Sequence, residues 1–256
     1  MDVSFLPAMT LLDTFPPDSN VAVIGASGGI GAAAIRLLSA DERVAEINAF
    51  SRRGELEGLP KVTAGRIEFD DEASIADAAA AAARNSPLDL VFVASGILWE
   101  GDDLRPEKAM REISMDGLAR LFAVNAAGPA LVAKHFLPKL RKDSKTMFAA
   151  LSARVGSIGD NRLGGWYSYR ASKAALNMLL RGLAIEHARL RPESVVVGLH
   201  PGTVDTGLSA PYTSRTPEKK LFSPEQSARY LIGVMDQLGP EETGQTFAWD
   251  GSRIDF

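Results

Sequence analysis

The sequence predicts an α/β fold: a single doubly wound, parallel β-sheet with helices on both faces. Short apolar runs typical of buried strands alternate with longer runs typical of helices along most of the chain. With 256 residues, 46% hydrophobic and 23% charged, the chain has the size and composition of one soluble globular domain. No repeat or low-complexity linker divides it, so we expect one domain at 20–256 after an N-terminal extension at 1–19.

The individual elements follow from the spacing of apolar residues. Runs rich in β-branched residues predict strands at 21–25, 44–51, 65–69, 89–94, 145–152, 194–200 and 245–249. Helices are expected between them, at 29–40, 72–84, 106–140 in two pieces, 167–190 and 224–238. The irregular stretch at 203–222 follows a strand, where open α/β sheets bind ligands, and is either a substrate lid or an ordinary loop.

The N-terminal extension does not have the pattern of a secretion signal, because it lacks a basic start, carries Asp2 and is interrupted by prolines. No run reaches eighteen uninterrupted apolar residues, so no membrane span is expected. Four apolar residues of the extension are expected to lie against the domain or a partner: Phe5, Leu6, Leu11 and Leu12.

Charge and composition exclude several classes of function. The net charge is −4 and the basic residues are scattered, which gives no electrostatic basis for binding nucleic acid or an anionic membrane. The absence of cysteine excludes disulfides and thiol catalysis and is compatible with a cytoplasmic location. No metal is expected, because His135, His187 and His200 have no ligand spacing and HExxH is absent.

A glycine-rich turn opens the predicted domain. The apolar run at 20–24 (NVAVI) leads into GASGGIG at 25–31, and the helix former AAAIRLL follows. A strand, a glycine turn and a helix N-terminus together form an anion site for a pyrophosphate, because bare backbone approaches it and unpaired N–H groups face it. The alternative is an ordinary βα turn. The candidate ligand-binding residues are Gly25, Ser27, Gly28, Gly29, Ile30 and Gly31.

The same turn also matches G-x-S-x-G, the nucleophile elbow of α/β-hydrolases. That interpretation requires several strands before the turn, yet only 24 residues precede Gly25. It also requires an acid and then a histidine downstream, for which only His200 is plausible. Nor does it give a role to a tyrosine and lysine pair further along the chain, Tyr169 and Lys173. We therefore favour the dinucleotide site.

Tyr169 and Lys173 stand four residues apart at the start of a predicted helix. Residues i and i+4 share one helix face, so the phenol and the ammonium can point into one site. A nearby cation favours the phenolate and is expected to lower the pKa of Tyr169 toward the working pH, as the general acid of a carbonyl reductase requires. Of the four tyrosines, only Tyr169 has a lysine at this spacing.

Together these motifs resemble the short-chain dehydrogenase/reductase family over roughly residues 20–250. VNAAGP at 124–129 is similar to the family's V-N-x-x-G segment, and HPGTVDT at 200–206 is similar to its P-G-x-x-x-T segment. Within the family, GSI at 156–158, GGWYSYR at 164–170 and SKAALN at 172–177 look most like the C-factor and sniffer-like carbonyl reductases. The resemblance implies a Rossmann-type sheet and hydride transfer between a nicotinamide and a carbonyl or alcohol carbon.

The resemblance also implies the roles of the catalytic residues. Tyr169 would act as general acid/base, Lys173 would assist it and hold the nicotinamide ribose, and Asn125 would anchor a water that relays protons. The position of the family's catalytic serine is occupied here by Ala153. Ser152 lies one position early and can serve only if the strand end bends, Ser157 is a second candidate, and neither need be catalytic.

The choice between NAD(H) and NADP(H) depends on the residues that follow the second predicted strand, where NAD-specific sites usually carry an acidic residue. Here Ser51 takes that place and Arg52 follows, and a hydroxyl with a guanidinium suits a 2′-phosphate, so the sequence predicts NADP(H) over NAD(H). The alternative is that Arg52 and Arg53 form a solvated turn. By resemblance, Asp70 would contact adenine, although it could equally be a turn residue.

Further cofactor contacts are implied by resemblance alone. The family's N-N-A-G is VASG here, so only the glycine is kept, and the nicotinamide carboxamide would be held by the P-G-x-x-x-T segment. These two segments contribute Ala94, Ser95 and Gly96, and Pro201, Gly202, Thr203, Val204 and Thr206.

Mostly apolar residues flank the predicted site, which indicates a hydrophobic carbonyl substrate: Leu98, Trp99, Ile158, Leu163, Trp166, Leu208 and Tyr212. The helices at 106–140 and 167–190 carry more apolar residues than one sheet face needs, and the family resemblance implies that they pair across a two-fold axis, giving a homodimer or homotetramer. The alternative function is a non-catalytic NADP(H)-binding or sensing protein that kept the fold.

Overall fold

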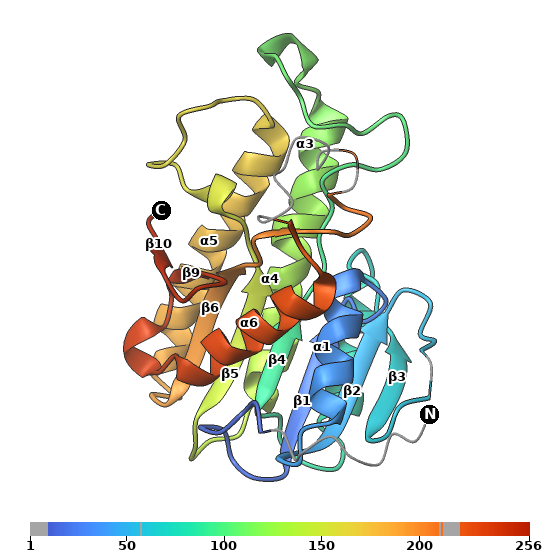
Figure 1. The fold of residues 1–256 in the computed structure, drawn as a ribbon, viewed down its shortest axis with the longest axis vertical. Helices are drawn as coiled ribbons and strands as arrows, with labels where there is room; N and C mark the ends of the chain where they lie inside the picture. Colours follow the sequence, from blue (N-terminus) through green and yellow to red (C-terminus); the bar gives the residue numbers. More distant parts are fainter. Residues whose placement is uncertain (1–9, 57, 210, 212–220) are drawn as a thin grey trace.

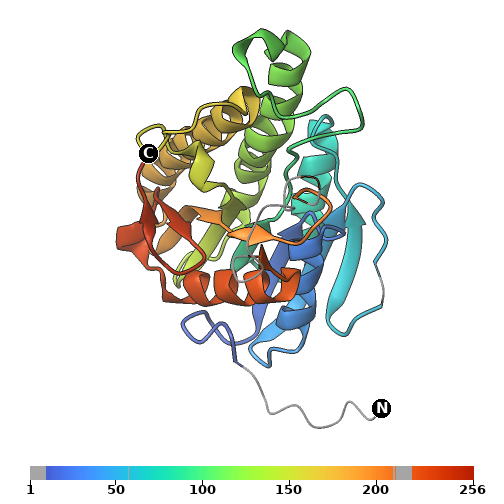
Figure 2. The same ribbon diagram turned by 45° about the horizontal axis from the view of Figure 1, so that its top comes forward.

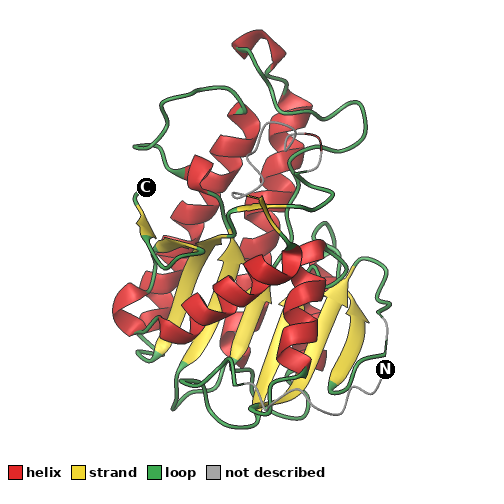
Figure 3. Ribbon diagram, viewed as in Figure 1, coloured by secondary structure: helices red, strands yellow, loops and turns green. Residues whose placement is uncertain are grey.

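The computed structural model describes residues 10–56, 58–209, 211 and 221–256, and in it one central sheet lies between two layers of helices (Figures 1 and 3). The eight strands of this sheet run in the order β10-β9-β6-β5-β4-β1-β2-β3. All neighbouring pairs are parallel except β9 with β10 at one edge. The predicted fold class, a doubly wound Rossmann-type sheet, is confirmed. The strand order reverses between β1 and β4, where folds of this kind bind ligands.

The strands of the central sheet are β1 (Ser19–Ile24), β2 (Val44–Ser51), β3 (Val62–Arg66), β4 (Leu90–Val93), β5 (Thr146–Leu151), β6 (Ser194–His200), β9 (Thr246–Ala248) and β10 (Arg253–Ile254). A separate small sheet pairs β7 (Thr203–Val204) with β8 (Leu221–Phe222). The helices are α1 (Gly29–Ser39), α2 (Glu72–Ala82), α3 (Met115–Phe122), α4 (Gly128–Phe136), α5 (Tyr167–Ala188) and α6 (Pro224–Gln237). Shorter helical turns are η1 (Met110–Glu112), η2 (Ala123–Ala127), η3 (Leu137–Lys139), η4 (Arg154–Gly156) and η7 (Pro240–Glu242).

Two hydrophobic clusters, one on each face of the sheet, form the core. Successive residues of β1 alternate between them: Val21 and Val23 belong to the first cluster, and Ala22 and Ile24 to the second. Helices α1 and α6 cover the first face, while α2, α4 and α5 cover the second (Figures 1 and 2). Because both faces are covered, the central strands β1, β4, β5 and β6 are buried along almost their whole length rather than on alternate residues.

Two predicted elements differ from the structure. Strand β3 occupies 62–66 rather than 65–69, because its pairing with β2 ends at Arg66. Ile67 and Phe69 beyond it turn into the second core cluster, which explains their apolar character. The first predicted helix of 106–140 begins only at Met115, where the Oγ of Ser114 accepts from the N–H of Gly117 and caps the helix. Strands β7, β8 and β10 are not predicted by the sequence, since two-residue strands carry too little periodicity.

The described part of the N-terminal extension is fastened to the domain near the start of β1. Leu12 and Phe15 are buried in the first core cluster, and Leu11 packs against it. The carboxylate of Asp41 accepts hydrogen bonds from the backbone N–H groups of Leu11 and Leu12 at 2.8 and 3.1 Å. Phe5 and Leu6, for which contacts were also expected, lie outside the described residues.

None of the helices in the described part of the chain is both long and apolar enough to cross a membrane.

Candidate active site

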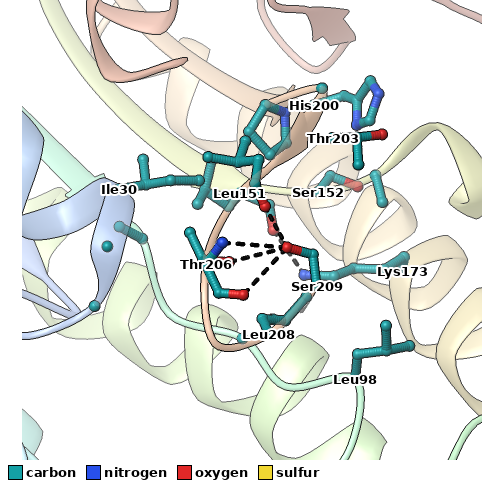
Figure 4. Close-up of a pocket in the computed structure, with 18 of the residues that line it drawn as sticks. Ile30, Leu98, Leu151, Ser152, Lys173, His200, Thr203, Thr206, Leu208 and Ser209 are labelled. Atoms are coloured by element: carbon teal, nitrogen blue, oxygen red, sulfur yellow. Dashed lines mark hydrogen bonds between the residues drawn. The ribbon is translucent and has the colours of Figure 1, made fainter. Parts of the chain in front are cut away.

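A cavity of about 650 Å³ opens at the carboxyl ends of the parallel strands (Figure 4). Its walls come from the turn between β1 and α1, the loop after β4, the end of β5 with η4, the start of α5 and the loop after β6. Most of the predicted site residues meet here: Ser27, Gly28, Gly29, Ile30, Ala94, Ser95, Gly96, Ser152, Tyr169, Lys173, Pro201, Gly202, Thr203, Val204 and Thr206.

The glycine turn forms one wall and leaves no room for a side chain at Gly25 or Gly31. Gly25 has a φ of +91°, and a Cβ there would lie 2.9 Å from the backbone of Ala94. A Cβ on Gly31 would lie 2.3 Å from the carbonyl oxygen of Gly25, so helix and turn approach each other only because Gly31 lacks one. Gly25 and Gly31 thus shape the turn from behind, while Ser27 to Ile30 line the cavity.

The N-terminus of α1 faces the cavity with its backbone donors available. Its cap residue is Gly28, and among the described residues no side chain caps the helix and no acidic residue stands in its first turn. The unpaired N–H groups of a helix N-terminus bind anions, and the helix dipole adds to their attraction. The residues present therefore fit a pyrophosphate group.

Tyr169 and Lys173 lie in the cavity wall on the first turns of α5, as their spacing predicts. The Nζ of Lys173 lies 5.9 Å from the centroid of the Tyr169 ring and donates a 2.8 Å hydrogen bond to the carbonyl oxygen of Leu151. Burial raises the pKa of Tyr169 to about 12 and lowers the pKa of Lys173 to about 7. Both shifts arise because the charged forms lose hydration.

The expected lowering of the Tyr169 pKa by Lys173 is therefore not present in this structure. Lys173 is only 3% exposed and Tyr169 is 8% exposed, so the loss of hydration outweighs the attraction between phenolate and ammonium. At neutral pH, Tyr169 holds its proton, and Lys173 is close to its titration midpoint.

Asn125 lies behind the cavity, in the π-helical turn η2 between α3 and α4. Its Oδ1 accepts from the N–H of Ile97 and its Nδ2 donates to the carbonyl of Ile97, both at 2.8 Å. Nδ2 also donates to the Oγ of Ser172 at 3.2 Å. A Cβ on Gly96 would lie 3.3 Å from Asn125 Oδ1 and 3.4 Å from Lys173 Nζ, so these groups converge where Gly96 leaves space.

Ser152 lines the cavity, but its hydroxyl is already engaged. It follows directly after β5, and its Oγ donates to Oδ1 of Asn177 at 2.7 Å. Ala153 packs instead with Tyr169 in a small apolar cluster beside the cavity. Ser157 is buried, and its Oγ accepts from the N–H of Asp160, but it does not belong to the cavity wall.

The loop after β6 forms another wall of the cavity and approaches the glycine turn closely. A Cβ on Gly29 would lie 2.8 Å from Cγ2 of Thr206. The Oγ of Ser209 holds this loop in shape, since it donates to the carbonyl oxygens of Val204 and Thr206 and accepts from the N–H of Thr206 (Figure 4). No sequence pattern indicates this role for Ser209. Positions 210 and 212–220 of the predicted lid, with Tyr212, lie outside the described residues.

Three residues predicted to contact the adenosine half of the cofactor, Ser51, Arg52 and Asp70, do not line the cavity. Ser51 is buried at the end of β2, and its Oγ accepts from the N–H of Gly54 at 3.1 Å. Arg52 is exposed. The pKa of Glu100 is lowered first by the hydrogen bond from Arg120, then by the charge of Arg120, and least by the charge of Arg52. Asp70 is exposed four residues after β3, and its charge acts on Arg120.

The remaining wall is mostly apolar, with two polar residues that the sequence analysis did not select. Leu98, Val155, Trp166 and Leu208 provide the apolar surface. Arg154 and His200 also line the cavity; burial, with a smaller effect of Arg154, lowers the pKa of His200 to about 4. Trp99 lies outside the cavity wall and holds it from behind, because its indole N–H donates to the carbonyl of Leu208 at 2.9 Å. Ile158 and Leu163 are 76% and 91% exposed and also lie outside the cavity wall.

Known proteins resemble this chain in sequence. A family profile described as "short chain dehydrogenase" matches residues 19–217. The C-signal protein of Myxococcus xanthus is 36% identical over 171 residues, which cover 66% of this chain and 92% of that protein. A Rhodococcus protein named 1-hydroxy-2-glutathionyl-2-methyl-3-butene dehydrogenase is 32% identical over 239 residues, covering 93% of this chain and all of that protein.

Solved structures show the same fold. An NADPH-bound carbonyl reductase from chicken fatty liver has a TM-score of 0.81 at 24% identity, covering 95% of this chain and 97% of that one. The carbonyl reductase Sniffer of D. melanogaster has a TM-score of 0.80 at 19% identity, covering 94% of this chain and all of that one.

Proposed function

The chain belongs to the short-chain dehydrogenase family, a family of oxidoreductases, and from this premise we propose an NADP(H)-dependent reaction. In it, a hydride passes between the nicotinamide and the carbonyl or alcohol carbon of a small, largely apolar substrate. The observation that carries the proposal is that Tyr169 and Lys173 face the same cavity as the glycine turn. The name of the Rhodococcus relative, a dehydrogenase of a hydroxy compound, is in keeping with this chemistry.

The residues present fit a dinucleotide. The glycine turn and the uncapped N-terminus of α1 would hold the pyrophosphate. Lys173 and the segments around Ala94 and Thr203 would hold the nicotinamide half. When bound, the cofactor supplies the hydride, and the protein supplies binding, orientation and proton transfer.

Tyr169 would act as the general acid in carbonyl reduction. With a pKa raised to about 12, its hydroxyl is protonated at neutral pH and can donate to the developing alkoxide. Lys173, with a pKa lowered to about 7, can lose and regain a proton within the working pH range. Asn125, which converges with Lys173 beside Gly96, would anchor the water that returns protons from solvent.

Ser152 is the candidate for polarising the carbonyl, because it lies in the cavity wall. Its hydroxyl proton is directed to Asn177, so it can serve in this way only by exchanging that partner for the substrate. The engaged Ser152 and the alanine at 153 are also the observations that favour the second candidate function, an NADP(H)-binding protein without turnover.

Selectivity for NADP(H) is proposed for Ser51 and Arg52. Arg52 is exposed beside the end of β2 and makes no hydrogen bond or ion pair with the described residues, so its guanidinium is available to a phosphate. Several solved structures with the same fold hold bound NADPH or NADP.

We also propose a homodimer or homotetramer in the cytoplasm. Exposed apolar side chains on α3 and α5, among them Phe122, Met178, Leu179 and Ile185, support an interface there. The absence of cysteine is compatible with the cytoplasmic location. Light scattering after gel filtration tests the assembly: a monomeric mass would contradict it.

The proposal is tested first by fluorescence titration of the protein with NADPH and NADH side by side. NADPH is expected to bind about tenfold or more tighter, equivalent to about 1.4 kcal/mol. A panel of aldehydes and ketones then follows NADPH oxidation by its loss of absorbance. Tight NADPH binding without turnover of any compound would favour the non-catalytic candidate, and binding of neither cofactor would contradict both.

A further inference from the structure

The start of the helix that carries Tyr169 has an unusual backbone. Gly164, Gly165 and Trp166 have φ values of +64°, +65° and +51°, three consecutive residues in the left-handed region. The third is a tryptophan, and non-glycine residues adopt this conformation only where their surroundings enforce it. Trp166 is both the N-cap residue of α5 and part of the cavity wall.

Glu107, which lies far earlier in the chain, accepts hydrogen bonds from two residues at the start of α5, Trp166 and Ser168. Its backbone carbonyl accepts from the N–H of Trp166 at 2.6 Å. Its side-chain carboxylate accepts from the N–H of Ser168, 3.3 Å from each oxygen, and from the Oγ of Ser168. Glu107 is 6% exposed, and the described partners of its buried carboxyl group lie at the N-terminus of α5.

This arrangement is an N-terminal cap supplied by a distant segment. The side chain of a tryptophan has no acceptor, so the N-cap residue Trp166 cannot itself cap the helix. The side chain of Glu107 supplies the missing acceptor at this end of the helix. The residue it fixes, Ser168, immediately precedes Tyr169.

The cap also fixes the contact between Trp166 and Tyr169. Their rings meet edge to face, with centroids 6.2 Å apart and an interplanar angle of 73°. Trp166 therefore forms a wall on which the substrate carbonyl would rest beside the Tyr169 hydroxyl. Displacement of this wall by a fraction of an ångström would misplace both the donor and the substrate.

We propose that Glu107 is a positioning residue for the reaction: it holds Trp166 in the left-handed conformation and fixes the first turn of α5, and thereby sets the geometry between Tyr169 and the substrate. This inference rests on the proposed function for its catalytic readout. Its structural readout, hydrogen exchange at the start of α5, is independent of activity.

The test compares Glu107→Ala and Glu107→Gln with Glu112→Ala. Glu112 belongs to the same segment, is exposed and accepts only from the N–H of Lys108 among the described residues, so it is a matched control. In Glu107→Ala, amides in peptides covering 164–170 should exchange about tenfold faster than in the wild type. Glu107→Gln keeps a carbonyl acceptor and should stay within about threefold of the wild type.

The catalytic readout separates positioning from simple loss of folded enzyme. A smaller folded fraction would lower kcat and leave KM unchanged. A displaced Trp166 wall should instead raise KM for the carbonyl substrate and lower kcat/KM by about tenfold or more, with the Kd of NADPH unchanged. Rescue by Glu107→Gln is expected.

If Glu107→Ala matches Glu112→Ala in both exchange and kinetics, the positioning role is wrong. If the wild type turns over no carbonyl compound, the proposed function fails, while the exchange experiment still decides whether Glu107 fixes the turn. Should Glu107→Ala fail to fold, Ser168→Ala gives the same comparison, because it removes the hydroxyl partner and keeps the backbone one. Unchanged exchange and KM in that variant would likewise contradict the proposal.

Discussion

Lys173 Nζ donates its hydrogen bond to the carbonyl oxygen of Leu151, the last residue of β5. The bond ties the helix that carries the proposed catalytic pair to the end of a central strand. It also places a buried amine beside the cavity, with its pKa lowered to about 7 by burial. Two measurable properties, catalysis and the pH dependence of stability, follow from this relationship.

Tyr169→Phe should lower kcat by about 10²–10⁴-fold, the usual contribution of a general acid, because it removes the proton that the alkoxide requires. The Kd of NADPH should remain within about twofold, since the ring still fills the same space. Tyr167→Phe is the matched control, because Tyr167 is exposed and lies outside the cavity wall. Unchanged turnover in Tyr169→Phe would remove Tyr169 from the mechanism.

Lys173→Met should change how stability depends on pH. The pKa of Lys173 is about 7 in the folded protein and 10.5 ordinarily, so between these values the unfolded chain binds more protons. The free energy of unfolding of the wild type should therefore rise with pH relative to the variant, by at most about 1.4 kcal/mol per pH unit. The advantage of the variant is greatest below pH 7.

Urea denaturation at about pH 6, 7.5 and 9, values that start below the folded pKa and rise into the interval between the folded and unfolded pKa, measures this difference. Lys139→Met, at an exposed position, serves as the control and should follow the wild type. Parallel curves for the wild type and Lys173→Met across the three pH values would show that the lysine is not buried as described.

Gly31→Ala should abolish NADPH binding and destabilise the fold by about 1–3 kcal/mol, because its Cβ would overlap the carbonyl oxygen of Gly25. Gly182→Ala is the contrasting variant. Gly182 is exposed within α5, and a Cβ there would meet no neighbouring atom within 4 Å, so alanine should stabilise the helix by about 0.5–1 kcal/mol. NADPH titration and thermal unfolding of both variants distinguish crowding from helix propensity.

Arg52→Ala should reduce the preference for NADPH over NADH by about tenfold or more, through weaker binding of NADPH alone. Arg53→Ala, at the neighbouring exposed position, should leave the ratio of the two dissociation constants unchanged. An equal effect of the two substitutions would mean that general positive charge, rather than a phosphate contact of Arg52, sets the preference.

Ser152→Ala should lower kcat by less than about tenfold, since the hydroxyl proton is already donated to Asn177. Loss of a donor that polarises the carbonyl costs about 10²–10³ in kcat. A loss of that size would show that Ser152 turns to the substrate during the reaction. Ser157→Ala, outside the cavity wall, provides the comparison.

The sequence predicts most of the sheet and helices because both faces of the sheet are covered and the central strands β4, β5 and β6 are largely apolar runs. The predicted strand at 65–69 is displaced because Ile67 and Phe69 are apolar residues that pack in the core without belonging to a strand. The sequence also places a helix start too early, because the cap at Ser114 is a weaker signal than the helix formers before it. The short strands β7, β8 and β10 leave almost no pattern to read.

For the site, motifs with fixed spacing locate the glycine turn and the pair Tyr169 and Lys173 at the cavity. Properties that depend on the burial of a side chain cannot be predicted from motif spacing. The raised pKa of Tyr169 follows from its lost hydration, which no local pattern expresses. Ser209 and Glu107 act through contacts with the backbone of the folded chain, so their roles become visible only once the chain is folded.

The two walls of the cavity differ in what a protein engineer can change. The wall at the glycine turn depends on bare backbone at Gly25, Gly29 and Gly31, where a single added carbon would collide with neighbouring atoms. The wall at Leu98, Trp166 and Leu208 is built from side chains that differ in size and can be exchanged. A mutant library directed at new substrates should therefore diversify the second wall and keep the first invariant.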